Sequence, residues 1–160
     1  MKSKTTIGWR EWVELPDWGI RIRAKADTGA KSSAIDCGEI IELPGERVRF
    51  TVRLDRKQTR LLTLEEPIQL RKRVRSSAGH SHDRIFVETT LRLGDVEQRI
   101  LVNLVCRKNM IHRMLLGRET LSGAFLVDSS VDHWITPNKP AQIVSSVCKS
   151  ALMRSPLKNQ

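Results

Sequence analysis

The sequence predicts one mainly β domain with a single short helix, because apolar and polar residues alternate along several segments. The alternation is clear over 20–26 and 48–54, and the segment 85–93 is typical of a further strand. Since successive side chains of a strand point to opposite faces, such a segment buries one face and exposes the other. A chain of 160 residues, 39% of them hydrophobic, can bury one core of this kind without a disulfide or a metal.

The strand predicted over 20–26 places isoleucine and alanine on one face and the basic residues Arg21, Arg23 and Lys25 on the other. Gly94-Asp95 predicts a turn into a further strand over 97–105. These strands form the greater part of the expected sheet.

The apolar run Met114–Leu116 ends at Gly117. This pattern is typical of a buried strand that leads into a short helix. We expect a domain over residues 1–134, followed by a C-terminal extension over 135–160 that is partly disordered. The extension carries prolines that break up any long element: Pro137, Pro140 and Pro156.

The most informative motif is Asp27-Thr28-Gly29-Ala30, which places a carboxylate on a tight turn at the end of the first predicted strand. Gly29 permits a backbone turn that a side chain would block. The Thr28 hydroxyl can hydrogen-bond to a neighbouring segment and hold the loop rigid. An ordinary surface turn is the alternative, since Asp, Thr and Gly are all common turn residues. The apolar-Gly-Arg run that ends at Arg118 favours the catalytic interpretation.

Together the two motifs resemble the retropepsins, single-domain aspartic proteases in which an Asp-Thr-Gly-Ala loop is backed by an apolar-apolar-Gly-Arg segment. The chain also resembles, more narrowly, a bacterial retropepsin-like family that carries the label ATP-dependent zinc protease. That family is RimB-like and is linked with RimK-type ATP-grasp ligases. The narrower resemblance runs from Ile7 to Asp128 and is carried by three segments, Gly8–Trp12, Ala24–Ala34 and Met114–Arg118.

The resemblance implies the closed β-barrel of the acid proteases and an aspartic endopeptidase with Asp27 as its catalytic residue. It assigns the support of the catalytic loop to Thr28, Gly29, Ala30, Leu116, Gly117 and Arg118. Aspartic proteolysis needs two carboxylates that share one proton. Because the chain offers one Asp-Thr-Gly, the active species is expected to be a two-fold homodimer in which both copies supply this Asp.

The residues give the family label little support. Neither a Gly-x-x-x-x-Gly-Lys-Ser/Thr loop nor a His-Glu-x-x-His helix occurs in the sequence. His80 and His82 would share a strand face and could form half a metal site, but exposed loop histidines are the favoured alternative. Three widely spaced cysteines predict reduced thiols, with Cys37 a small buried side chain rather than a nucleophile. We therefore expect no metal and no cofactor.

The segment from Arg71 to Arg84 occupies the place of the retropepsin flap, a hairpin that closes over the substrate. Its candidate tip consists of small and polar residues, Ser76, Ser77, Ala78, Gly79 and His80. With one glycine, this tip should be stiffer and more polar than the Gly-rich flaps of retroviral enzymes. A polar surface loop is the alternative.

Lys31 departs from the retroviral pattern, which has an acid at this position that pairs with the arginine of the Gly-Arg segment. Arg118 therefore needs another partner. Glu119, Asp36 and an acid of the partner chain are the alternatives. Lys31 also brings a cation close to the catalytic loop.

Lys and Arg outnumber Asp and Glu by 28 to 18, a formal net charge of +10. Such a field attracts acidic partners, although cations scattered for solubility are the alternative explanation. The ligase link of the resembled family makes an acidic peptide, an ATP-grasp ligase or a ribosomal surface the expected partners. An aromatic content of 4% argues against base-stacking platforms, while contact with a phosphate backbone stays open.

The sequence has no apolar stretch long enough to span a bilayer, and no apolar core follows the N-terminus to act as a secretory signal. We expect a cytoplasmic protein without membrane contact. Two functions from different classes remain: a homodimeric aspartic endopeptidase, and a non-catalytic retropepsin-like module that binds an acidic peptide, a ligase or a ribosomal surface. Asp27→Asn separates them, because it abolishes cleavage but not binding.

Overall fold

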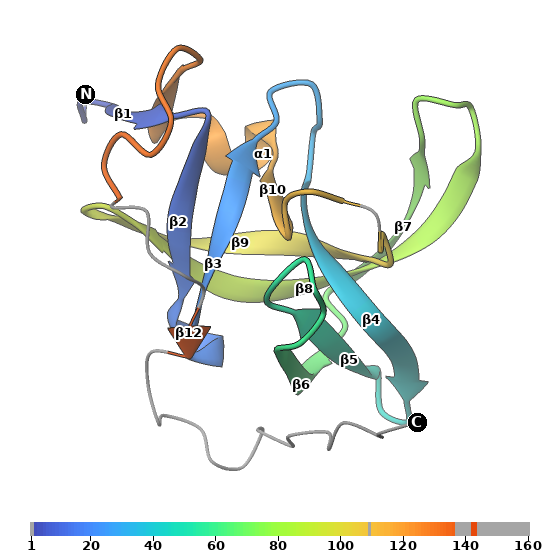
Figure 1. Cartoon of the computed structure of the whole chain (residues 1–160). Helices are drawn as coiled ribbons and strands as arrows, with labels where there is room; N and C mark the ends of the chain where they lie inside the picture. The colour runs from blue at the N-terminus through green and yellow to red at the C-terminus, as the bar shows by residue number, and fades with distance from the viewer. Residues whose placement is uncertain (1, 109, 137–141, 144–160) are drawn as a thin grey trace.

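The computed structural model describes residues 2–108, 110–136 and 142–143 (Figure 1). Strands dominate, and the predicted mainly β class with one short α-helix is confirmed. The elements in chain order are β1 (Thr5–Gly8), β2 (Arg10–Leu15), the 3-10 turn η1 (Pro16–Trp18), β3 (Ile20–Ala26), β4 (Ser33–Leu43), β5 (Arg47–Arg53), β6 (Leu61–Pro67), β7 (Leu70–Arg75), β8 (Ser81–Leu93), β9 (Val96–Val105), β10 (Met114–Leu116), α1 (Arg118–Leu121), β11 (Phe125–Asp128) and β12 (Gln142–Ile143).

Six strands form a closed barrel in the order β10-β3-β2-β8-β9-β4. The short strand β10 closes it, because β10 pairs with β3 in parallel and with β4 in antiparallel orientation. The β4–β9 pair is parallel as well, while the remaining pairs of the ring are antiparallel. The expected closed barrel is therefore confirmed, and a strand of three residues completes it.

Further strands extend from the barrel. The β5–β6 hairpin continues the sheet from β4, and β7 pairs with the first half of β8. Figure 1 shows the β7–β8 hairpin projecting from the barrel, with its tip at the same end of the molecule as α1 and the β3–β4 turn. β1 and β11 form a separate parallel pair.

The core fills the barrel, and β3 illustrates the alternation that predicted it. Ile20, Ile22 and Ala24 are buried, whereas the basic residues between them face outward. The predicted strands within 48–54, 97–105 and 114–116 correspond to β5, β9 and β10. β8 begins at Ser81 rather than at 85, because its exposed start pairs with β7 and needs no apolar face.

Glu11 fastens the segment after β11 onto β2. Its carboxylate is buried and accepts hydrogen bonds from the backbone N–H of Gly8 (2.9 Å), Ile135 (3.0 Å) and Thr136 (3.1 Å), and from the Thr136 hydroxyl. The Trp12 N–H donates to the same hydroxyl at 2.8 Å. Residues 135 and 136 of the expected extension thus contact the barrel.

Further along the chain, β12 pairs with the start of β3. The rest of the expected extension, 137–141 and 144–160, lies outside the described residues, so its predicted disorder stays a prediction. No helix in the described part of the chain is long and apolar enough to cross a membrane.

Candidate active site

Asp27 lies directly after β3, on the turn that leads to β4. Its backbone N–H donates to the Leu116 carbonyl at 2.9 Å, which continues the β3–β10 ladder by one residue. The Ala30 N–H donates to the Asp27 carbonyl at 3.2 Å and closes the turn. The carboxylate is half-buried, and its Oδ1 accepts a hydrogen bond from the Gly29 N–H at 3.2 Å. Strand pairing and turn geometry therefore fix the position of this carboxylate.

Arg118 holds the same turn from the other side. Its Nη1 donates to the carbonyls of Thr28 (3.1 Å) and Gly29 (3.0 Å), and its backbone N–H donates to the Ala30 carbonyl at 2.9 Å. The Thr28 side chain is exposed. The structure thus brings together all seven residues that the sequence assigned to the catalytic loop and its support.

The expected carboxylate partners of Arg118 within the chain are wrong. Glu119 forms an exposed ion pair with Lys31 at 3.8 Å, and Asp36 is buried with two other arginines. Two backbone carbonyls satisfy Arg118 instead, because the β3–β4 turn directs them at its guanidinium. The Lys31 ammonium has Glu119 as its carboxylate partner.

Gly117 is the glycine that this site requires. A Cβ built on it would lie 2.4 Å from the Ser32 carbonyl carbon and 2.5 Å from its oxygen, far inside contact distance. Gly29, by contrast, does not adopt a left-handed conformation, and a Cβ there would lie 3.4 Å from Asp27 Oδ1. The expectation that Gly29 permits a turn closed to side chains is therefore not met within this chain, and the close approach occurs at Gly117.

A buried hydroxyl pair supports Gly117, and the sequence analysis missed it. Ser33 Oγ accepts a hydrogen bond from the Gly117 N–H at 3.0 Å and lies 2.6 Å from Thr120 Oγ1. Both side chains are buried. A serine at the start of an apolar strand was the available signal, but its partner is far away in the sequence.

The candidate flap tip is the turn between β7 and β8. The Ser76 N–H donates to the His80 carbonyl at 2.8 Å, and Gly79 adopts a left-handed φ of 84°. Ser77, Ala78, Gly79 and His80 are exposed. The tip stands apart from the Asp27 turn in Figure 1, so this single chain does not bring the two together.

The residues considered as an alternative nucleophile and as metal ligands lie on different elements. Cys37 is fully buried, and this burial is the main reason why the pKa of its thiol is raised. His82 lies in the exposed first part of β8, near the flap tip. No group of three or more His, Cys, Asp or Glu side chains within the described ranges could hold a metal ion.

A second buried polar cluster, which the sequence did not predict, is centred on Asp36. Asp36 is buried and accepts hydrogen bonds from Arg53 Nη1 (2.7 Å), the Arg107 N–H (2.9 Å) and Arg113 Nη1 (2.5 Å). Arg53 and Arg113 are also buried. The cluster ties β4 to β5 and to the residues before β10.

The model of the RimB-like family, described as retropepsin-like aspartic endopeptidase RimB, matches residues 6–138. The chain belongs to this family. It is also similar to proteins named probable alpha-L-glutamate ligase: 32% identical to one from Parasynechococcus marenigrum (83% of this chain, 30% of that protein) and 33% identical to one from Desulfotalea psychrophila (81% and 29%). A third, from Shewanella halifaxensis, is 32% identical over 94% of this chain and 35% of its own length.

The chain thus spans about a third of the length of these ligase-named relatives. Among solved structures it is similar to a Legionella pneumophila protein of unknown function, with a TM-score of 0.67 and 29% identity, over 82% of this chain and 98% of that one. The chain therefore combines a closed six-stranded β-barrel with membership of a family described as retropepsin-like.

Proposed function

We propose that this RimB-like protein is an aspartic endopeptidase of retropepsin type that hydrolyses peptide bonds with an Asp dyad formed across a homodimer. The observation that carries the proposal is the Asp27 turn, which the Leu116 carbonyl holds from one side and the Arg118 guanidinium from the other. A carboxylate anchored this firmly at a strand end is suited to catalysis that depends on exact positioning.

In the proposed mechanism, Asp27 of each subunit meets its counterpart on the two-fold axis. Two carboxylates so close together cannot both ionise, so they share one proton. The ionised carboxylate takes a proton from water, and the protonated one donates a hydrogen bond to the scissile carbonyl. The attacking water adds to the carbonyl carbon, and proton transfer to the amine nitrogen then releases the two peptide products.

The flap tip at 76–80 would close over a bound peptide once the dimer forms. The net charge of +10 favours an acidic peptide or protein in the cytoplasm, which an ATP-grasp ligase or a ribosomal surface could present. The mechanism as proposed uses only carboxylates and water.

The test combines light scattering with peptide cleavage from acid to neutral pH, for the wild type, Asp27→Asn and Asp95→Asn. Asp95 lies on the exposed turn before β9 and is the matched control. We expect a dimer that cleaves, an Asp27→Asn dimer that does not, and an Asp95→Asn protein that behaves as wild type. A dimer whose cleavage survives Asp27→Asn would refute the proposed dyad.

A non-catalytic module is the second candidate, and the names of the relatives favour it. Proteins named probable alpha-L-glutamate ligase contain a segment similar to this chain in about a third of their length. In such a role the surface around the Asp27 turn would bind an acidic peptide, a ligase or a ribosomal surface. A monomer that is inert throughout the pH range but binds acidic peptides, with or without Asp27→Asn, would favour this candidate over the peptidase.

A further inference from the structure

The outward face of β3 carries three cations that form no ion pair in the described part of the chain. Arg21, Arg23 and Lys25 alternate with the buried residues of the strand. Within the described residues, none of the three forms an ion pair with an acid, whereas other exposed strand arginines do, namely Arg49 with Glu65, Arg92 with Glu14 and Glu97, and Arg99 with Asp17 and Glu88. Asp132, which Arg10 binds, acts on Arg23 without pairing with it, so the β3 face carries three unpaired cations.

Indole rings support the two arginines of this face and the neighbouring Arg10. The guanidinium carbons of Arg21 and Arg23 lie 5.7 and 5.6 Å from the Trp12 ring, and that of Arg10 lies 4.6 Å from the Trp9 ring. Trp12 is only 7% exposed, so it supports the arginines from below and offers no ring face to a ligand. The face therefore presents charge rather than a stacking platform.

The positive field continues into the residues before β10. The His112 ring packs edge-on against Trp9, with ring centroids 5.8 Å apart. Burial, helped by Arg23, Arg10, Lys25 and Arg113, lowers the pKa of His112 to about 4. Four cations therefore lie close enough to act on this ring.

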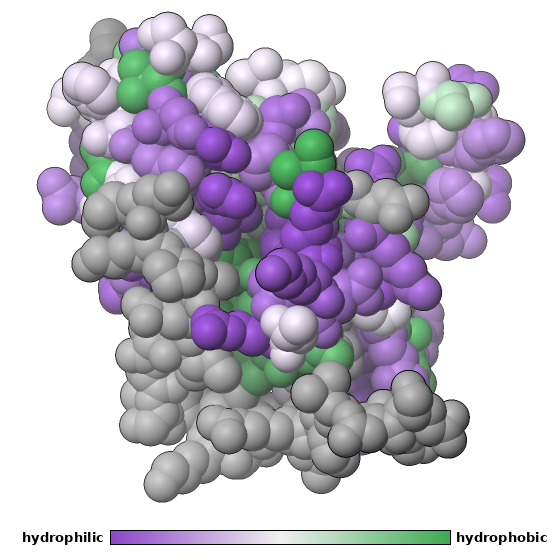
Figure 2. Space-filling view, viewed as in Figure 1, coloured by the Kyte–Doolittle hydropathy of each residue, from purple (hydrophilic) through white to green (hydrophobic). Residues whose placement is uncertain are grey.

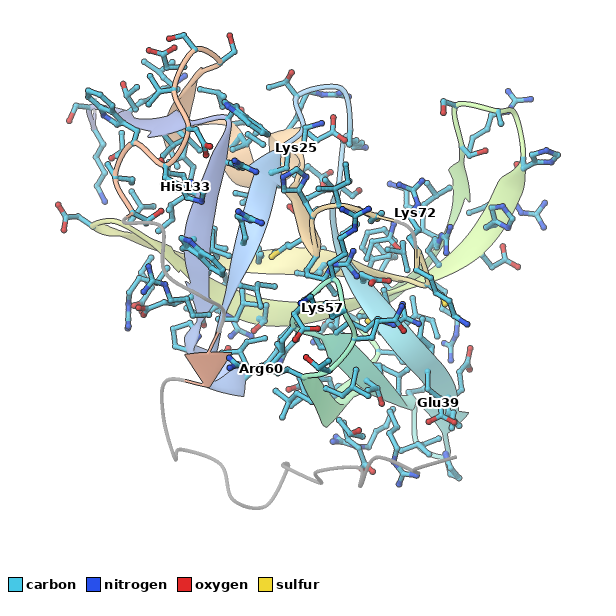
Figure 3. The ribbon with its side chains drawn as sticks, in the orientation of Figure 1. Lys25, Glu39, Lys57, Arg60, Lys72 and His133 are labelled. Atoms are coloured by element: carbon cyan, nitrogen blue, oxygen red, sulfur yellow. The ribbon has the colours of Figure 1, made fainter. Side chains whose placement is uncertain are left out.

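The buried Arg113, which pairs with Asp36, links this neighbourhood to the loop between β5 and β6. Its Nε and Nη2 are buried and have no hydrogen-bond partner among the described residues. The charge of Arg56, on that loop, also acts on Arg113. Figure 3 places Lys57 and Arg60 on the same side of the molecule as Lys25, and Figure 2 shows hydrophilic side chains over the centre of this side.

The C-terminal part of the sequence carries no acidic residue. β12 pairs with β3 at Ile20 and Arg21. Residues 135–160 contain no Asp or Glu and carry four basic residues, Lys139, Lys149, Arg154 and Lys158. This part of the chain therefore supplies no counter-charge to the β3 face.

Strand pairing indicates which kind of polyanion fits. An extended peptide is commonly recognised by adding a strand to a free sheet edge, but β3 is paired with β2 on one side and with β10 and β12 on the other. The face thus offers side-chain cations, while most of the strand is paired on both sides. Alternate residues of a strand lie about 6.6 Å apart, so the three cations span about 13 Å.

Nucleic acid matches this pattern, because every nucleotide carries a permanent charge, with one phosphate per about 3.4 Å of strand axis. The guanidinium fork of arginine suits phosphate oxygens. We propose that the outward face of β3, with the loop 54–60, is a binding surface for the phosphodiester backbone of nucleic acid. It recognises charge rather than base sequence, and it is separate from the peptidase function of Asp27.

The test measures fluorescence anisotropy of a short labelled single-stranded RNA of mixed sequence with the full chain, between about 50 and 200 mM salt. The variant Arg21→Gln/Arg23→Gln/Lys25→Gln is compared with Arg49→Gln/Arg92→Gln/Arg99→Gln, which removes the same three charges from exposed strand positions. With about 0.7 in salt slope per phosphate contact, we expect the β3 variant to lose about 2 and to bind at least tenfold more weakly. The control variant should stay close to wild type.

Equal losses in the two triple variants would overturn the proposal, because binding would then follow net charge alone. An absence of RNA binding by the wild type would overturn it too. So would a poly-glutamate peptide that displaces RNA from the β3 face at a lower concentration of negative charges than unlabelled RNA needs. Parallel titrations with single-stranded DNA and duplex RNA identify which nucleic acid supplies the backbone.

Two further variants keep the test independent of folding and of the peptidase. If circular dichroism shows that the triple variant is unfolded, Lys25→Gln, at an exposed position, should lower the salt slope by about 0.7, and an unchanged slope would count against the proposal. Asp27→Asn should bind RNA as wild type does, so the peptidase proposal can fail while this one stands.

Discussion

Gly29 lies in the Asp27 turn and Gly117 packs against the chain that follows it. Their steric surroundings differ, so packing requires a glycine at 117 but tolerates a side chain at 29. We expect Gly117→Ala to cost about 1–3 kcal/mol in the free energy of unfolding, because its Cβ would overlap the Ser32 carbonyl group. Gly29→Ala should stay within about 0.5 kcal/mol, since its Cβ finds an ordinary contact distance. Urea unfolding of both variants measures the difference, and equal costs would contradict this account of the turn.

His112 should make stability depend on pH. Burial and four neighbouring cations lower the pKa of His112 in the folded protein to about 4, from an ordinary 6.5. Between these values the unfolded chain binds a proton that the folded protein does not, so the free energy of unfolding falls as pH drops from about 6.5 to 4. Above 6.5 this residue contributes no pH dependence.

Unfolding by urea at several pH values, for wild type and His112→Gln, measures this contribution. The variant should have a shallower slope between pH 6.5 and 4, with part of the slope retained because burial also lowers the pKa of His133. An NMR titration of the His112 ring gives the pKa directly. A His112 resonance that titrates near 6.5 would refute the assignment.

At the scale of the element, Glu11 fastens the segment 131–136 onto β2. Glu11→Gln replaces a carboxylate that accepts three backbone N–H groups and a hydroxyl, so we expect a loss of at least about 2 kcal/mol in unfolding free energy. Glu14→Gln on the same strand is the control, because Glu14 is in an exposed pair with Arg92 and should cost under about 1 kcal/mol.

Hydrogen exchange locates the effect of this substitution. The amides of Ile135 and Thr136 should exchange faster in Glu11→Gln than in wild type, while those of the β8–β9 ladder keep their protection at mild conditions. Unchanged exchange at these two amides would mean that other contacts hold the segment in place.

Strands whose exposed and buried faces alternate in polarity were predictable from the sequence, and β3 is the clearest case. β4 was not, since it buries Ser33 and Asp36, whose partners lie 17 to 87 residues away. β7 was expected only through the resemblance, as part of a flap hairpin, because five of its six residues are exposed and only pairing with β8 makes it a strand. Local pattern therefore predicts strands with one buried face, while long-range polar contacts decide the others.

At the scale of the molecule, the sequence predicted the two motifs of the candidate site and their order, and the barrel explains why they meet. β10 pairs in parallel with β3, so both strands end on the same side and Leu116 reaches the Asp27 amide. The buried supports could not be predicted, because Ser33, Thr120 and the Asp36 cluster become neighbours only when the barrel closes. A dyad across two chains remains a prediction.

Asp36 should affect both the stability of the whole molecule and the geometry of the candidate site. It is the acid that pairs with two buried arginines, Arg53 and Arg113. Asp36→Asn removes their counter-charge, so we expect a loss of about 3–5 kcal/mol in unfolding free energy. Glu65→Gln is the matched control, since its ion pair with Arg49 is exposed and should contribute under about 1 kcal/mol.

The effect of Asp36→Asn should also reach Asp27. Arg113 directly precedes β10, and the last residue of β10, Leu116, accepts the hydrogen bond of the Asp27 amide. Loss of the ion pair should therefore speed hydrogen exchange at the Asp27 amide more than at the amides of the β8–β9 ladder between Thr89 and Ile100, at a denaturant concentration where both proteins remain folded. Equal acceleration in both places would mean that Asp36 stabilises the barrel without positioning the turn, because a purely global loss of stability speeds the most protected amides together.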